Sequence, residues 1–284
     1  MMKIAGFALV LTALPGAVLA QERVSFPSAD GKTALTAYVF APPKRGAAVP
    51  AVVMMHGRGG VYSSAAKGRY DASTISRRHR MWGTLWAANG YLAVLVDSFG
   101  PRGYPGGFPR FSYNTRPDAV NEVSVRPLDA YGALTWLRAR KDIAGDRVGL
   151  QGWSNGGSAA LAAMAAGPGF GRPDSQKGFG AALVFYPACR LRGRFDDGYR
   201  PYAPVRVFHG TADEETSSRR CNTLVERSRK AGGDIAITLY PGAVHGFDDP
   251  GRARQANPAN RKAKEDATAR ALRFFAERLA APKP

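Results

Sequence analysis

The sequence predicts an α/β fold in which helices cover both faces of a mainly parallel central sheet. Apolar runs of strand length alternate with helix-length segments along residues 21–284, and this order is typical of parallel sheets. Two of the runs, Pro50–Met55 and Tyr91–Val96, are continuously apolar, as expected of strands buried on both faces. Loops that combine glycine with polar residues follow several strands, and ligands bind at such strand ends.

The N-terminus has the layout of a secretory signal peptide. Lys3 precedes a short apolar run over Ile4–Leu14, and Val18-Leu19-Ala20 stands at the cleavage positions. The run is too short to cross about 30 Å of hydrocarbon, so we do not expect a membrane anchor. We expect residues 1–20 to be removed as a signal peptide. Residues 21–284 should then form one domain, periplasmic or secreted, without stable insertion into a membrane.

The first half of the chain predicts a hairpin, two buried strands and a helix. Val24–Pro27 and Thr33–Phe40 are rich in residues that favour strands, and Asp30-Gly31 between them is a turn dipeptide. The buried strands are the two apolar runs described above. Met81–Ala88 has a helical pattern and is followed by a glycine stop signal. A long loop rich in glycine and proline is expected over Asp97–Pro117.

The second half continues the alternation of helices and strands. Leu128, Tyr131, Leu134 and Leu137 recur every three residues and mark one face of a helix. The later elements, in chain order, are a strand over Arg147–Gln151, a helix over Gly157–Ala166, strands over Ala181–Tyr186 and Val205–His209, a helix over Cys221–Ala231, a strand over Ile235–Tyr240 and a helix over Arg261–Leu279.

The chain is strongly basic, with a formal net charge of +18 at pH 7. Such an excess is compatible with nucleic acid, an anionic surface or acidic substrates as partners. The basic residues are scattered and form neither a stripe interleaved with aromatic residues nor a recognition motif. We therefore expect no nucleic-acid partner, and a solvated basic surface is the simplest interpretation.

The two cysteines, Cys189 and Cys221, predict a disulfide bond because an even pair in an exported protein is usually oxidised. Two free buried thiols are the alternative. A metal site is not expected, because no histidine lies at ligand spacing from either cysteine.

Ser154 is the candidate nucleophile. The segment Gly152-Trp153-Ser154-Asn155-Gly156 matches G-x-S-x-G, and it joins a predicted strand to a helix of small residues. Such a turn forces the serine into a strained backbone conformation, and side chains at the flanking glycines would collide with neighbouring elements. The helix that follows aims its N–H groups at the serine oxygen. The alternative is a serine that only caps this helix.

His245 is the candidate general base among four histidines. In this architecture the chain order is nucleophile, acid, histidine. His56 and His79 precede Ser154, and His209 ends a strand before any plausible acid loop. His245 alone follows the last strand, in a loop where a base can reach the serine.

Asp213 is the candidate acid that orients the imidazole and stabilises its charged form. It lies in the glycine-led loop after the strand Val205–His209. Glu214 and Glu215 are adjacent, and spacing alone does not exclude them.

The oxyanion formed on a substrate carbonyl needs two hydrogen-bond donors. One is the backbone N–H of Asn155, the residue after the nucleophile. The other is expected from the loop after Pro50–Met55, at the N–H of Gly57 or Arg58.

Together these residues resemble the dienelactone hydrolase family of α/β-hydrolases. The elbow Gly152–Gly157, the acid loop His209–Asp213 and the histidine loop Tyr240–Phe247 look like its three signatures, and Asp97–Gly103 is similar to loops of exported relatives. The match runs over Val24–Leu279. The resemblance implies the α/β-hydrolase fold, a hydrolase without a cofactor, and a monomer or weak homo-oligomer.

The sequence departs from that family at two positions. The name-giving enzymes have cysteine where this chain has Ser154, and glutamate where it has Gly57. These departures favour a serine esterase acting on a small-molecule carboxylic ester over an enzyme acting on dienelactones. Arg102, which suits an anionic substrate, and Trp153 are candidate substrate-binding residues.

Two other functions remain open. The elbow also resembles the catalytic domain of prolyl-oligopeptidase-type peptidases, although those usually carry a large additional domain for which this sequence has no room. A serine peptidase or an acyl-aminoacyl hydrolase is therefore the second hypothesis. A non-catalytic binding protein on the same fold is the third hypothesis, and the presence of all three candidate catalytic residues in the expected order argues against it.

Overall fold

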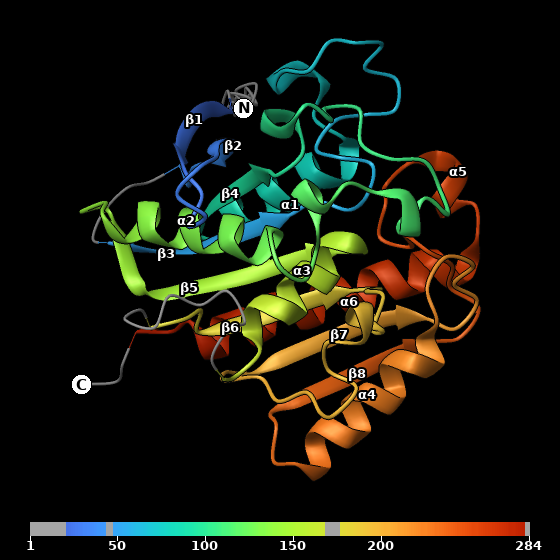
Figure 1. The fold of residues 1–284 in the computed structure, drawn as a ribbon. Helices are drawn as coiled ribbons and strands as arrows, with labels where there is room; N and C mark the ends of the chain where they lie inside the picture. Colours follow the sequence, from blue (N-terminus) through green and yellow to red (C-terminus); the bar gives the residue numbers. More distant parts are fainter. Residues whose placement is uncertain (1–20, 44–47, 168–176, 282–284) are drawn as a thin grey trace, which may run out of the picture.

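The computed structural model describes residues 21–43, 48–167 and 177–281. The predicted signal peptide lies outside these residues. The described chain forms one eight-stranded sheet with helices on both faces (Figure 1). The strands are β1 (Glu22–Pro27), β2 (Ala34–Phe40), β3 (Val49–Met55), β4 (Leu92–Asp97), β5 (Ile143–Trp153), β6 (Ala181–Phe185), β7 (Val205–Gly210) and β8 (Ile235–Tyr240).

The sheet is mainly parallel, as the sequence predicts. Its strand order is β1-β2-β4-β3-β5-β6-β7-β8. The predicted hairpin is present, because β1 and β2 are antiparallel and pair Phe26 with Leu35. β2 also runs antiparallel to β4, and every pair from β4 to β8 is parallel. The carboxyl ends of six neighbouring strands therefore meet along one edge, which is where ligands bind in such folds.

Two hydrophobic clusters cover the two faces of the sheet. Alternate residues of a strand point to opposite faces, and on β3 Val53 packs in one cluster while Met54 packs in the other. The first cluster includes side chains of α2, α3 and α4, and the second includes side chains of α1 and α6 (Figure 1). The helices are α1 (Arg77–Ala88), α2 (Arg126–Arg138), α3 (Asn155–Met164), α4 (Ser218–Lys230), α5 (Arg252–Gln255) and α6 (Pro258–Arg278).

Several element boundaries differ from the sequence prediction, and side-chain caps explain the early starts of α1 and α6. Helix α1 begins four residues earlier than expected, because the hydroxyl of Ser76 accepts the N–H of His79 and caps the helix. Helix α6 begins at Pro258, where Asn257 provides the cap. The loop after β4 contains short 3-10 turns, including Gly100–Arg102. None of the helices within the described ranges has the length and apolar character needed to span a bilayer.

Candidate active site

Ser154 occupies a sharp turn between β5 and α3. Its backbone has φ 52° and ψ −117°, a conformation that costs a non-glycine residue free energy. The N–H of Ser154 donates to the carbonyl of Phe185 on the adjacent strand at 2.9 Å, which fixes the turn. A Cβ added at Gly152 would lie 2.2 Å from the carbonyl oxygen of Gly156, and one added at Gly156 would lie 2.1 Å from that of Met55. Both positions therefore require glycine, as expected for a nucleophile elbow.

Asp213 and His245 meet at the ends of β7 and β8. The imidazole Nδ1 of His245 lies 2.9 Å from Oδ2 and 3.1 Å from Oδ1 of Asp213. The carboxylate also accepts the N–H groups of Glu215 and Thr216 and the hydroxyl of Thr216, at 2.8, 2.8 and 2.9 Å. Burial would raise the pKa of Asp213, but the hydrogen bond and charge of His245 and the N–H of Thr216 hold it below its ordinary value. The ionised acid can thus orient the imidazole.

The two acids that spacing alone could not exclude have other partners. Glu214 accepts the backbone N–H of His245 at 3.1 Å rather than contacting the ring. Glu215 lies on the opposite side of the imidazole, with Oε2 3.8 Å from Nε2 of His245. The same carboxylate is held by the guanidinium of Arg58 through hydrogen bonds of 2.8 and 2.9 Å.

The other three histidines are buried in surroundings that favour the neutral ring. Burial, together with the charge of Arg126, lowers the pKa of His56 well below its ordinary value. Burial lowers the pKa of His79 to about 4, with the charge of Arg78 acting in the same direction. Burial also lowers the pKa of His209, although the charge of Asp213 opposes this effect.

Ser154 follows β5 and His245 follows β8 at the same edge of the sheet, and no hydrogen bond joins the two side chains. Ser154 bonds through its N–H to Phe185, and the ring of the next residue, Tyr186, packs edge-on against His245 with centroids 4.7 Å apart. Within the described part of the chain, the Nε2 atom of His245 has Glu215 as its nearest charged neighbour and makes no hydrogen bond to Ser154. Both residues are only 8% exposed.

A cavity of about 680 Å³ opens in front of Ser154. Ser154 and Asn155 line it together with residues from the loops after β3, β4, β6 and β7. Arg58, Arg116, Arg190, Arg192 and Arg220 contribute cationic side chains to the lining, and Glu215 contributes a carboxylate. The exposed ring of Phe111 also lines the cavity. The volume is in the range of cavities that bind small molecules.

A model of the dienelactone hydrolase family matches residues 35–279 of the sequence. The chain belongs to the dienelactone hydrolase family. The chemistry of this family is hydrolysis, and the observed sheet and helices are those of the α/β-hydrolase fold that the sequence predicts. No curated protein matches the sequence significantly.

Solved structures share this fold at low sequence identity. Esterase 2 of Thermogutta terrifontis, phosphoramylated by tabun, is 22% identical with a TM-score of 0.62, and the match covers 96% of this chain and 100% of that one. The propionate-bound form of the same esterase is also 22% identical, with a TM-score of 0.62 and coverage of 95% and 99%. A protein from Klebsiella pneumoniae subsp. pneumoniae MGH 78578, proposed to be a dienelactone hydrolase, is 18% identical with a TM-score of 0.65 and coverage of 90% and 98%.

In this member of the dienelactone hydrolase family, Gly57 and Asn155 lie on either side of Ser154. A Cβ placed on Gly57 would be 3.5 Å from Cβ of Ser154, so the loop after β3 runs directly beside the candidate nucleophile. Asn155 is the first residue of α3, and the first N–H groups of a helix have no acceptor within it. The two segments thus present backbone donors beside Ser154. The side chain of Arg58 binds Glu215, so only its N–H remains a candidate donor.

Arg126 connects these two segments, and the sequence analysis missed it. The guanidinium is fully buried and donates 2.8 Å to the carbonyl of His56 and also to Oδ1 of Asn155. The amide of Asn155 donates in turn to Glu122 at 3.2 Å. Burial lowers the pKa of Arg126 to about 10, although the charges of Asp129 and Glu122 oppose this effect. Its position at the start of α2, next to a proline, gives no local sign of this role.

Arg102 and Trp153 have partners other than the expected substrate. Arg102 is bound to Asp129 by two hydrogen bonds of 2.8 Å and to Asp30 at 3.1 Å. Trp153 is fully buried, and its indole N–H donates to Asp248. Neither side chain is among those that line the cavity at Ser154. Both contacts join residues that are distant in sequence, and local sequence patterns do not reveal such contacts.

The predicted disulfide is present between Cys189 and Cys221, which are 32 positions apart. Cys189 also lines the cavity at Ser154. In the parts of the chain that the structure describes, no three side chains of histidine, cysteine, aspartate or glutamate converge as metal ligands would.

Proposed function

We propose that the protein is a serine hydrolase of carboxylic esters that uses Ser154, His245 and Asp213 as a catalytic triad. The observation that carries the proposal is the strained elbow of Ser154, which lines a cavity at the same sheet edge as the hydrogen-bonded pair of Asp213 and His245. The family supports hydrolysis, and the similar Thermogutta terrifontis protein is an esterase.

In the proposed acylation step, Nε2 of His245 takes the hydroxyl proton of Ser154 while Oγ bonds to the ester carbonyl carbon. The carbonyl oxygen becomes an oxyanion that the N–H groups of Asn155 and of Gly57 or Arg58 stabilise. Asp213 stabilises the imidazolium that forms. When the intermediate collapses, the bond to the alcohol oxygen breaks and His245 returns the proton to that oxygen. An acyl group remains on Ser154.

In deacylation a water molecule takes the place of the alcohol. His245 removes one of its protons as the water oxygen bonds to the acyl carbon. The second tetrahedral intermediate then collapses, the bond to Oγ breaks, and the proton passes from His245 to Ser154. The products are the free acid and the regenerated serine. Before each step, Nε2 of the imidazole must turn from Glu215 towards the hydroxyl of Ser154.

The proposal is tested by covalent labelling and by substitution. The Thermogutta terrifontis esterase is phosphorylated by paraoxon, so we expect a phosphonate ester probe to label the peptide that contains Ser154. Ser154→Ala should lower kcat for 4-nitrophenyl butyrate at least about ten-thousandfold. The exposed Ser124 offers a control, and Ser124→Ala should keep wild-type turnover. Labelling elsewhere, or turnover that survives in Ser154→Ala, would contradict the proposal.

Comparing 4-nitrophenyl esters with aminoacyl 4-nitroanilides as substrates distinguishes the other functions that the sequence left open. Rapid cleavage of aminoacyl 4-nitroanilides, with esters cleaved slowly, would favour a peptidase. A folded protein that cleaves neither class and reacts with no phosphonate would favour a binding protein.

A further inference from the structure

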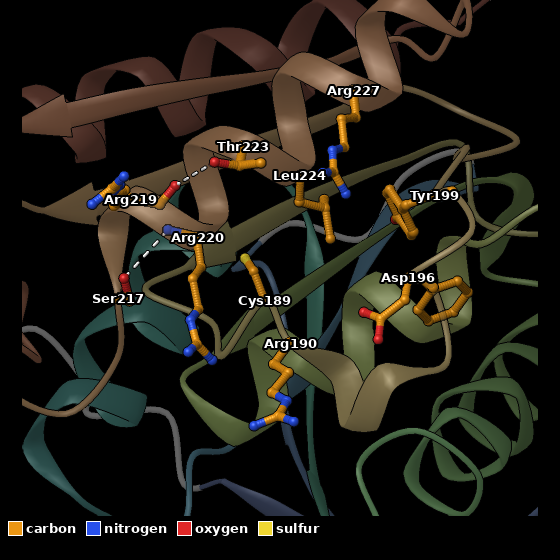
Figure 2. Close-up of a pocket in the computed structure, with 12 residues that line it drawn as sticks. Cys189, Arg190, Asp196, Tyr199, Ser217, Arg219, Arg220, Thr223, Leu224 and Arg227 are labelled. Atoms are coloured by element: carbon orange, nitrogen blue, oxygen red, sulfur yellow. Dashed lines mark hydrogen bonds between the residues drawn. The ribbon is translucent and has the colours of Figure 1, made fainter.

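The cavity at Ser154 adjoins a second cavity that lies along the loop after β6 and helix α4. The second cavity, of about 610 Å³, is the one shown in Figure 2. The two cavities share the lining residues Cys189, Arg190, Ser217 and Arg220. Together they form a groove that runs from Ser154 past the disulfide to Arg227, and we call it the arginine groove.

The lining of the arginine groove is strongly cationic. Seven arginines line it, against two acidic residues, Asp196 and Glu215. Glu215 is already bound by Arg58 at 2.8 Å and by Arg110 at 2.8 Å. Little negative charge is therefore available within the groove to pair with its arginines.

Several of these arginines have no carboxylate partner. Glu122, which lies outside the groove, binds Arg192 at 3.0 Å. Among residues 21–43, 48–167 and 177–281, no carboxylate lies within 4.0 Å of the guanidinium groups of Arg190, Arg220 or Arg227. The same holds for Arg116, whose Nε donates only to the hydroxyl of Ser112. Burial and the nearby charges of Arg58 and Arg192 lower the pKa of Arg116, although the charge of Glu122 opposes this effect.

The disulfide holds two of the unpaired arginines in neighbouring segments. Arg190 directly follows Cys189, and Arg220 directly precedes Cys221. The bonded cysteines bring their Cα atoms to 5.0 Å, so the two cationic segments stay adjacent without a countercharge between them. Figure 2 shows both side chains extending past Cys189, one from the loop after β6 and the other from α4. Like charges held together in this way repel one another, and a bound anion would relieve the repulsion.

We propose that the arginine groove binds a short polyanionic chain whose ester group is presented to Ser154. This inference rests on the proposed function, and it specifies the chemistry of the substrate. The guanidinium fork matches the paired oxygens of a carboxylate or a phosphate. Repeated oxyanions along a chain would meet Arg116 near Ser154 and Arg190, Arg220 and Arg227 further along. A single charged group would leave most of the groove unused.

Binding is measured directly on Ser154→Ala protein, so that the result does not depend on catalysis. The probes are a galacturonate hexamer, which carries carboxylates, linear hexaphosphate, and maltohexaose as the uncharged chain. We expect the galacturonate hexamer, the hexaphosphate or both to bind, and maltohexaose not to bind. Affinity should fall as salt is added, because screening weakens the attraction. Whichever anion binds more tightly identifies the carboxylate or phosphate form of the ligand.

Substitutions separate the groove from the general basic surface. Arg190→Gln with Arg220→Gln should weaken binding of the charged hexamer about tenfold or more, since two charge-assisted hydrogen-bonding groups are lost. Arg229 is exposed on the same helix and outside the groove, and Arg229→Gln removes the same kind of charge. The control should change the dissociation constant less than about twofold. Equal weakening by both changes, or no binding of either anion, would overturn the proposal.

Competition then locates the chain relative to the catalytic serine. In wild-type protein the charged hexamer should raise the KM for 4-nitrophenyl butyrate and leave kcat unchanged. Unaltered kinetics at saturating hexamer would overturn the placement in this groove. Absence of any 4-nitrophenyl butyrate turnover would instead count against the proposed function, while the binding results on Ser154→Ala would stand independently.

Discussion

The carboxylate of Asp248 accepts the indole N–H of Trp153 at 2.9 Å. Trp153 is the residue before Ser154, and Asp248 lies three residues after His245. The same carboxylate accepts the indole N–H of Trp82 at 2.8 Å and the hydroxyl of Tyr186. It is fully buried. Asp248 therefore fixes the loop of the candidate base to the strand that carries the candidate nucleophile.

Replacing Asp248 with asparagine should loosen this connection while keeping the size of the side chain. The side-chain oxygen of asparagine cannot accept hydrogen bonds from Trp82, Trp153 and Tyr186 at once, and its N–H groups would face some of these donors. We expect the free energy of unfolding to fall by about 2–4 kcal/mol and kcat to fall with it. Urea denaturation and ester turnover measure the two effects. Asp249 is one-third exposed and pairs with Arg78 at 3.2 Å, so Asp249→Asn should cost less than about 1 kcal/mol. Equal costs for the two variants would contradict the role given to Asp248.

The elbow should reject a single added methyl group. A Cβ at Gly156 would lie 2.1 Å from the carbonyl oxygen of Met55 and 2.3 Å from that of His56. Gly156→Ala must therefore displace β3 or α3, and we expect a loss of stability of about 3 kcal/mol or more together with loss of turnover. A Cβ at Gly59 has no atom within 4 Å, so Gly59→Ala serves as the control. Thermal unfolding midpoints of the two variants provide the comparison, and a Gly156→Ala protein as stable as the control would refute the steric argument.

Local sequence patterns were enough to predict the sheet and the position of Ser154. The continuously apolar run over Pro50–Met55 predicts a strand with both faces covered, because a strand exposed on one face would alternate apolar and polar residues. The elbow is equally local, since its two glycines and its serine lie within five residues. The meeting of Asp213 with His245 follows from parallel strands whose ends share one edge, and needs no knowledge of side-chain packing.

The residues that support the site could not be predicted in this way. Arg126 and Asp248 are charged, and a single sequence gives no sign that such side chains are buried. Arg102 is the opposite case, because its glycine-rich loop favours a ligand-binding side chain, while its partners Asp30 and Asp129 lie in distant segments. In each case a long-range contact decides the position of the side chain.

Arg126 should affect turnover without contacting the substrate. Its two terminal nitrogens hold Asn155 and the carbonyl of His56, which flank the expected oxyanion donors. Lysine keeps the charge but cannot reach both acceptors, so Arg126→Lys should lower kcat about 10- to 100-fold and change KM little. Steady-state kinetics with 4-nitrophenyl butyrate measure kcat and KM separately. Arg138 lies on the same helix and binds the carbonyl of Gly145, so Arg138→Lys should leave kcat unchanged. A rise in KM with constant kcat would instead indicate substrate contact.

Asp30 predicts a specific dependence of stability on pH. Burial would raise its pKa, but the N–H groups of Lys32 and Thr33, the hydroxyl of Thr33 and the charge of Arg102 lower it to about 2. The pKa of Asp30 is lower in the folded chain than in the unfolded chain, so the unfolded chain takes up a proton first as pH falls. The contribution of the Asp30 carboxylate to the free energy of unfolding is therefore lost in acid. Asp30→Asn should be less stable than wild type at pH 7, and the difference should shrink between about pH 4 and about pH 2. Urea denaturation across this range tests the sign, and a difference that grows in acid would contradict it.

The disulfide should contribute to stability and also to anion binding. Cys189 and Cys221 close a loop of 32 positions, for which the chain-entropy estimate is about 3–4 kcal/mol. The double change Cys189→Ala with Cys221→Ala should lower the free energy of unfolding by about this amount. Ser154 is held by its own strand and helix, so turnover of a neutral ester should persist in protein that remains folded. Binding of whichever charged hexamer binds the wild-type groove should weaken, because Arg190 and Arg220 are then free to separate. Loss of neutral-ester turnover with unchanged hexamer affinity would contradict this division of roles.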